Sequence, residues 1–217
     1  MIARKRQTYG EEVANVLTHG AGMLFGITAI VVLMMAAIRS GNPWAVGSFA
    51  VYSVCMTLSY VTSTSYHASN RARQKRLLRR FDHSAIYLHI AGTYTPFTLV
   101  ALRQEGYWGW SLFAIVWIAA VVGVWLSFRK MRKKDHLKTV CYLAMGWVVV
   151  IAFKPLLHVF RETDSMDVLY WLIGGGLFYT VGSLFFFLDK YKYMHPVWHF
   201  FVLGGSICHF ISIYLLV

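Results

Sequence analysis

Two histidines near the C-terminal end of the sequence have a spacing that suits a metal ion. His195 and His199 are four residues apart, so on a helix their imidazoles would lie on one face, one turn apart. Neutral imidazoles in this arrangement can bind a single metal ion, as they do in HExxH helices. Pro196 is compatible with this prediction because proline is tolerated in the first turn of a helix. The alternative is that both are interfacial histidines, hydrogen-bonded to water or to the backbone.

Three further polar residues could complete such a site. His67 offers a third nitrogen, and three protein ligands with an open position for water are the usual pattern of catalytic zinc. Ser63 precedes His67 by four residues and shares its helix face, although a serine in a spanning helix also commonly bonds back to an earlier carbonyl. Asp82 is predicted to orient or deprotonate a water at the metal, to cap the helix expected to begin there, or to do both.

The elements that carry these residues are long apolar segments. Residues of the AVILMFWYC set make up 58% of the 217 residues and charged residues only 14%, against roughly 45–50% and 25% in a soluble domain. This composition excludes intrinsic disorder and predicts an all-α membrane protein, with one membrane domain over residues 1–217. A spanning helix needs about 20 apolar residues. Seven segments qualify: 16–38, 44–66, 82–102, 107–128, 139–160, 167–188 and 196–217.

The basic residues predict how this seven-helix bundle is oriented. Of the 21 Lys and Arg residues, 17 precede the first segment or lie in the connections 2–3, 4–5 and 6–7. The other side has only Arg39, Arg103, Lys154 and Arg161. The positive-inside rule therefore places the N-terminus in the cytoplasm and the C-terminus outside. We expect the cytoplasmic basic loops to contact anionic lipid head groups, at about 1 kcal/mol per basic residue. Nucleic acid is not expected, because the basic residues form short blocks between apolar runs rather than one exposed face.

In this orientation the polar residues of four expected spans meet at their cytoplasmic ends. The second span ends with residues 63–67, the third begins with 82–84, and the seventh begins with 195–199. The first span contributes a spaced polar set: Glu12, Asn15, Thr18 and His19. Ionisable side chains inside spans are costly and are functional candidates by default. His89 and His209 are the histidines expected to lie deeper.

Together these motifs resemble the hemolysin III branch of the progestin and adipoQ receptor family, and the resemblance covers nearly the whole chain. The motifs are Glu12-x-x-Asn15-x-x-Thr18-His19, Ser63-x-x-x-His67, Phe81-Asp82-His83-Ser84 and His195-x-x-x-His199. The resemblance implies a zinc ion near the cytoplasmic face, held by histidines that match His67, His195 and His199. It also implies that Ser63 and Asp82 match the family's serine and aspartate beside the zinc. The wider superfamily includes alkaline ceramidases, which hydrolyse a lipid amide.

Three functions follow from this reading. The first is a zinc-dependent lipid amide hydrolase of the inner (plasma) membrane, acting in lipid or fluidity homeostasis. Asp82 would accept and return the proton, and Ser63 would stabilise the water or the oxyanion. The second is a non-enzymatic membrane regulator with a structural zinc, in which Asp82 would complete the coordination. The third is a pore-forming cytolysin, which the sequence disfavours because most polar groups stop in the inner third. Membrane lipid is the expected partner, and the sequence predicts no oligomeric state.

Overall fold

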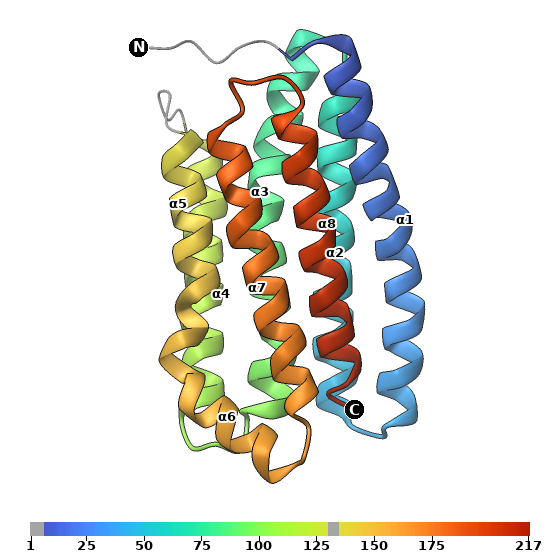
Figure 1. The fold of residues 1–217 in the computed structure, drawn as a ribbon. Helices are drawn as coiled ribbons and strands as arrows, with labels where there is room; N and C mark the ends of the chain where they lie inside the picture. Colours follow the sequence, from blue (N-terminus) through green and yellow to red (C-terminus); the bar gives the residue numbers. More distant parts are fainter. Residues whose placement is uncertain (1–6, 130–134) are drawn as a thin grey trace.

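The computed structural model describes residues 7–129 and 135–217, and these residues form helices joined by short connections (Figure 1). The basic residues at positions 4–6 and 130–134, for which a cytoplasmic position was predicted, lie outside the described residues. The helices are α1 (Tyr9–Arg39), α2 (Pro43–Ala68), α3 (Ala72–Pro96), α4 (Trp108–Phe128), α5 (Asp135–Gly146), α6 (Phe153–Glu162), α7 (Met166–Phe187) and α8 (Met194–Tyr214). A π-helical segment, η1 (Phe97–Ala101), extends α3, and a 3₁₀ segment, η2 (Trp147–Ala152), joins α5 to α6. The all-helical prediction is confirmed.

Six helical stretches among the described residues are long and apolar enough to cross a bilayer. They are α1, α2, α4, the stretch Leu137–Glu162, α7 and α8. The remaining long helical stretch is α3 with η1. Its second half contains the expected third span, whereas its first half carries the basic residues of positions 73–80. The fifth expected span is a broken helix. Pro155 has no N–H to donate to the carbonyl of residue 151, and the 3₁₀ segment ends just before it.

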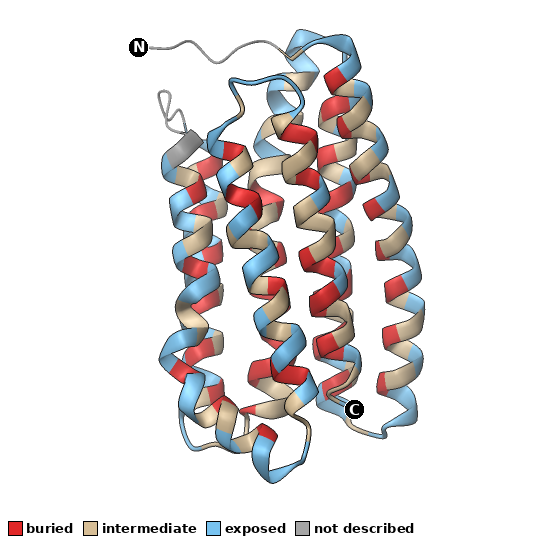
Figure 2. Cartoon of the chain, in the orientation of Figure 1, coloured by how far each residue is buried: buried red, intermediate tan, exposed pale blue. Residues whose placement is uncertain are grey.

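The bundle exposes large apolar side chains and buries many small or polar ones. Figure 2 shows how buried and exposed positions alternate along the helices. On α1 the exposed face includes Leu17, Leu24 and Val31, whereas Gly22 and Gly26 are buried against α2. This distribution is typical of a helix that contacts lipid on one side, since small residues allow membrane helices to approach closely.

The polar ends of α1, α2 and α8 lie together at the top of Figure 1 because α1 packs on both α2 and α8. A capping box begins α1: Thr8 Oγ1 accepts from the Glu11 N–H, and the Thr8 N–H donates to Glu11 Oε2 at 2.8 Å. The other carboxylate oxygen of Glu11 accepts from the backbone N–H of Tyr193 at 3.0 Å. Tyr193 is the N-cap of α8 and has a left-handed backbone conformation. The carboxylate of Glu11 therefore holds the starts of α1 and α8 next to each other.

Candidate metal centre

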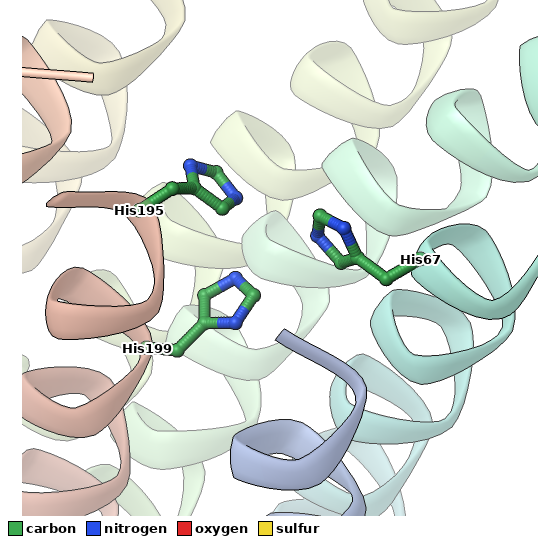
Figure 3. A group of neighbouring side chains, drawn as sticks. All are labelled: His67, His195 and His199. Carbon is green, nitrogen blue, oxygen red and sulfur yellow. The ribbon is translucent and has the colours of Figure 1, made fainter. Parts of the chain in front are cut away.

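Three buried histidines from two helices form one cluster. His67 lies at the end of α2, and His195 and His199 lie in the first turns of α8. One ring nitrogen of each lies within 4.8 Å of the other two, and Figure 3 shows the rings pointing toward a common space. Their exposed fractions are 2%, 7% and 0%. The structure therefore brings together the three predicted ligands, a set that could hold a metal ion.

The hydrogen bonds of His67 leave one nitrogen directed at the cluster. Its Nδ1 lies 2.7 Å from Glu12 Oε2 and 3.2 Å from the amide nitrogen of Asn15. A carboxylate only accepts hydrogen bonds, so Nδ1 carries the proton and donates to Glu12. Nε2 then carries a lone pair, and among the described residues this buried atom has no hydrogen-bond partner.

His199 has the same arrangement on the other side of the cluster. Its Nδ1 lies 3.3 Å from the hydroxyl of Thr18, whose proton goes to the carbonyls of Ala14 and Asn15 at 2.9 and 3.1 Å. The hydroxyl therefore accepts from Nδ1–H, and Nε2 of His199 is left as a buried atom with no partner in the described part of the chain. A buried acceptor without a partner costs about 1–3 kcal/mol. Metal-binding histidines usually donate their other ring N–H to a carboxylate, carbonyl or water, so this donor set fits a metal ion.

A cation from the basic connection supports the same carboxylate. Lys75, on α3, donates from Nζ to Glu12 Oε1 at 2.7 Å and lies 5.2 Å from the ring centre of Tyr66. Glu12 therefore bridges Lys75 and His67 and links α1, α2 and α3 at the cluster. From its place in a basic block, Lys75 was predicted only to contact lipid head groups. The spacing of Glu12, Asn15 and Thr18 does place them on one helix face, and this was the signal that they act together.

His19 contacts the cluster without belonging to it. Its ring stacks on that of His199, with 3.5 Å between centroids and 20° between planes. It also meets Tyr60 edge-on at 5.1 Å. Neither ring nitrogen of His19 has a hydrogen-bond partner among the residues described, yet His19 is not part of the group whose ligand atoms lie within 4.8 Å of one another. The position of this histidine was left open by its sequence, and here it packs behind His199.

Ser63 and Asp82 lie on different helices near the three histidines. Ser63 is buried on α2, 2% exposed and one turn from His67. Asp82 is half-buried on α3, with Oδ2 3.4 Å from Nδ1 of His83, and its charge interacts with His67 and His19. Asp82 is not in the group formed by the three histidines.

The predicted capping role of Asp82 is wrong. The helix α3 begins at Ala72, with Arg71 as its N-cap, so Asp82 lies in the third turn rather than at the start. Apolar residues mark only the part of a helix that contacts lipid, and α3 continues beyond that part through the basic residues of positions 73–80. The carboxylate lies 3.4 Å from His83 in the structure, and its role beside a metal stays a prediction.

Comparisons with known proteins identify the family of this chain. The model of the family described as "Haemolysin-III related" matches residues 7–210. Hemolysin-3 of Bacillus cereus is 41% identical over 212 residues, which cover 98% of this chain and 94% of the relative. The Hemolysin-3 homolog of Bacillus subtilis is 40% identical over 206 residues, covering 95% and 94%. The human Monocyte to macrophage differentiation factor is 27% identical over 217 residues, covering 97% and 86%.

The six apolar helices and the bacterial relatives together make this chain a multi-pass protein of the plasma membrane. The family match covers almost every described residue of the bundle, including all three clustered histidines. The chain belongs to the haemolysin III family, the bacterial branch of the progestin and adipoQ receptor family.

Proposed function

We propose that the three-histidine cluster is a zinc site and that the protein is a membrane-embedded hydrolase of lipid amides. The observation that carries the proposal is the donor set. Three buried imidazoles converge, two of them are held through Nδ1 with Nε2 directed inward, and no carboxylate joins the group among the described residues. Three histidines with an open position are the pattern of catalytic zinc, whereas structural zinc sites are closed by a fourth protein ligand.

A zinc ion held by these residues would lower the pKa of a water far below its value in bulk water, to about 7, and would polarise a carbonyl oxygen. Asp82 is the group that accepts the proton of the attacking water and returns it to the leaving amine, since its carboxylate lies on the neighbouring helix within electrostatic reach of His67. The hydroxyl of Ser63 donates to the oxygen that becomes negatively charged. Glu12 and Thr18 hold His67 and His199 in the orientation that keeps Nε2 available.

The orientation of the bundle is part of the proposal. We take α3 with η1 as a seventh span, the N-terminus as cytoplasmic and the C-terminus as external, because 17 of 21 basic residues then lie on the cytoplasmic side. The cluster would then lie near the cytoplasmic face, where the acyl chains of a substrate reach it from the inner leaflet. The basic loops on this side would contact anionic lipid head groups.

The test is amide hydrolysis by purified, zinc-loaded protein against a panel of ceramides, with metal content measured on the same preparations. We expect about one zinc per chain, turnover of at least one ceramide, and loss of turnover with retained zinc in Asp82→Asn. Zinc loss in Asp82→Asn would instead identify Asp82 as a fourth ligand and favour the structural-zinc regulator. Release of a dye from liposomes by the wild-type protein, without ceramide turnover, would favour the cytolysin that the name of Hemolysin-3 of Bacillus cereus suggests.

A further inference from the structure

A second feature with ligand-binding geometry lies at the opposite end of the bundle. A cavity of about 360 Å³ opens between the start of α2, the junction of α3 with η1, and α4. Its walls include Trp44, Val51, Leu99, Phe113 and Trp117. Trp44 is 23 residues before His67 on the same helix, which corresponds to about 35 Å of helical rise. The cavity is therefore separate from the histidine cluster, and its volume is in the range of small-molecule sites, about 300–1,000 Å³.

The backbone of the walls keeps this space open. α3 reaches the cavity at Pro96 and continues as the π-helical segment η1, and π-helical turns occur frequently at functional sites. On the facing helix, Gly47 lines the cavity, and a Cβ atom built there would meet nothing within 4 Å. The space thus extends to the α2 backbone itself.

The polar groups in the walls are already satisfied by one another. Trp117 donates from Nε1 to the hydroxyl of Thr95 at 3.1 Å, and Ser48 donates to the carbonyl of Trp44 at 2.6 Å. The wall therefore offers an occupant mainly apolar contact, which suits a hydrocarbon chain.

A positive charge with an unused hydrogen-bond donor lies against one wall residue of the cavity. The guanidinium carbon of Arg103 lies 4.9 Å from the ring centre of Trp44, which is itself part of the wall. Nε of Arg103 is buried without a hydrogen-bond partner in the described part of the chain. Leaving such a donor unsatisfied is costly, and the planar guanidinium fork matches the oxygens of a phosphate. A cation stacked on the wall residue Trp44 therefore favours an anion next to an apolar hollow.

We propose that this cavity and Arg103 bind one anionic phospholipid, with an acyl chain between α2 and α4 and the phosphate on the guanidinium. Charge complementarity selects this occupant over a zwitterionic lipid, whose own cation would oppose Arg103. The volume of the hollow selects a lipid over free phosphate, which would leave the apolar walls unused. In the proposed orientation the bound lipid belongs to the outer leaflet, on the side of the bilayer away from the basic loops. The site requires no metal ion and stands independently of the proposed hydrolase.

Native mass spectrometry of the full chain in detergent tests this proposal, using phosphatidylglycerol and phosphatidylcholine of the same acyl length, with glycerol phosphate as a headgroup-only competitor. We expect one phosphatidylglycerol to remain bound at concentrations where phosphatidylcholine does not, and glycerol phosphate not to displace it. Arg103→Gln should weaken phosphatidylglycerol binding by about tenfold or more, because charge-assisted hydrogen bonds are lost. Gly47→Leu should reduce binding of both lipids by filling the hollow.

Arg161→Gln is the matched control, because Arg161 is an exposed arginine near the end of α6, whereas Arg103 is the arginine that stacks on the wall residue Trp44. It should bind phosphatidylglycerol as the wild type does. Unfolding temperatures measured without added lipid show whether each variant is folded. Equal binding of the two lipids by the wild type, full displacement by glycerol phosphate, or unchanged binding in folded Arg103→Gln would each overturn the proposal.

Discussion

The carboxylate of Glu12 offers the sharpest test of the metal centre, because it acts on the cluster only through His67. It accepts from His67 Nδ1 at 2.7 Å and from Lys75 Nζ at 2.7 Å. Glu12→Gln keeps the shape and one acceptor oxygen but removes the negative charge. A hydrogen bond to a charged group contributes about 1.5–3 kcal/mol and a neutral one about 0.5–1.5 kcal/mol. Losing the charge at the bond to His67 therefore costs about 1–1.5 kcal/mol, or about tenfold in zinc affinity.

Glu12→Ala removes the acceptor as well and should weaken zinc binding toward about a hundredfold, the upper end of the effect seen when partners of metal ligands are removed. The assay is competition between the purified protein and a fluorescent zinc chelator of known affinity, in detergent at fixed pH. Glu162→Gln is the control, since Glu162 is an exposed acid at the far end of α6. A zinc affinity of Glu12→Gln within twofold of wild type would refute the reasoning that this carboxylate fixes the ligand.

Three further outcomes are expected. His199→Ala should lose zinc altogether, as measured by elemental analysis. Removal of zinc from the wild type by a chelator should lower its unfolding temperature, as measured by thermal unfolding, because two buried imidazole nitrogens are left unsatisfied. Gly22→Ala should lower the free energy of unfolding by about 1–3 kcal/mol, because its Cβ would overlap the buried ring of Tyr60, whereas Gly20→Ala meets nothing within 4 Å and should be neutral or slightly stabilising. Alkaline phosphatase fused after the last residue should be active and a green fluorescent protein fused there should not fluoresce, as an external C-terminus requires; the opposite pattern would reject the orientation.

The grouping of the three histidines was predictable in part because its signal is local and chemical. The spacing of His195 and His199 fixes a shared helix face, and the charge distribution placed His67 at the same depth. The structure adds the proximity of the three rings. The ring centroid of His67 lies 5.3 Å from that of His195 and 5.1 Å from that of His199, and those of His195 and His199 lie 4.6 Å apart. Sequence spacing could not predict that His67 lies beside the other two rings, because this proximity depends on how α2 packs against α8.

Contacts between distant segments and the true ends of helices could not be predicted in the same way. Lys75 belongs to a basic block that suits lipid head groups, and only the packing of α3 beside α1 shows that it pairs with Glu12. The start of α3 at Ala72 was missed because charged residues end an apolar run without ending a helix. The break in the fifth expected span is the converse case. There the apolar run continues from Trp147 through Phe153, while the helix geometry changes to 3₁₀ within it, ahead of Pro155.

The position of Asp82 within α3 bears most directly on whether the cluster could be catalytic. If Asp82 capped a helix beside a loop, a small loop movement could bring its carboxylate onto the metal and close the site. The structure places it in the third turn of a continuous helix that runs from Ala72 to Pro96. Coordination by Asp82 would then require α3 as a whole to move toward α8, against its packing on α2 and α4. Closure of the site by Asp82 would therefore be costly, which favours the proposed hydrolase, with its open position for water, over the regulator with a structural zinc.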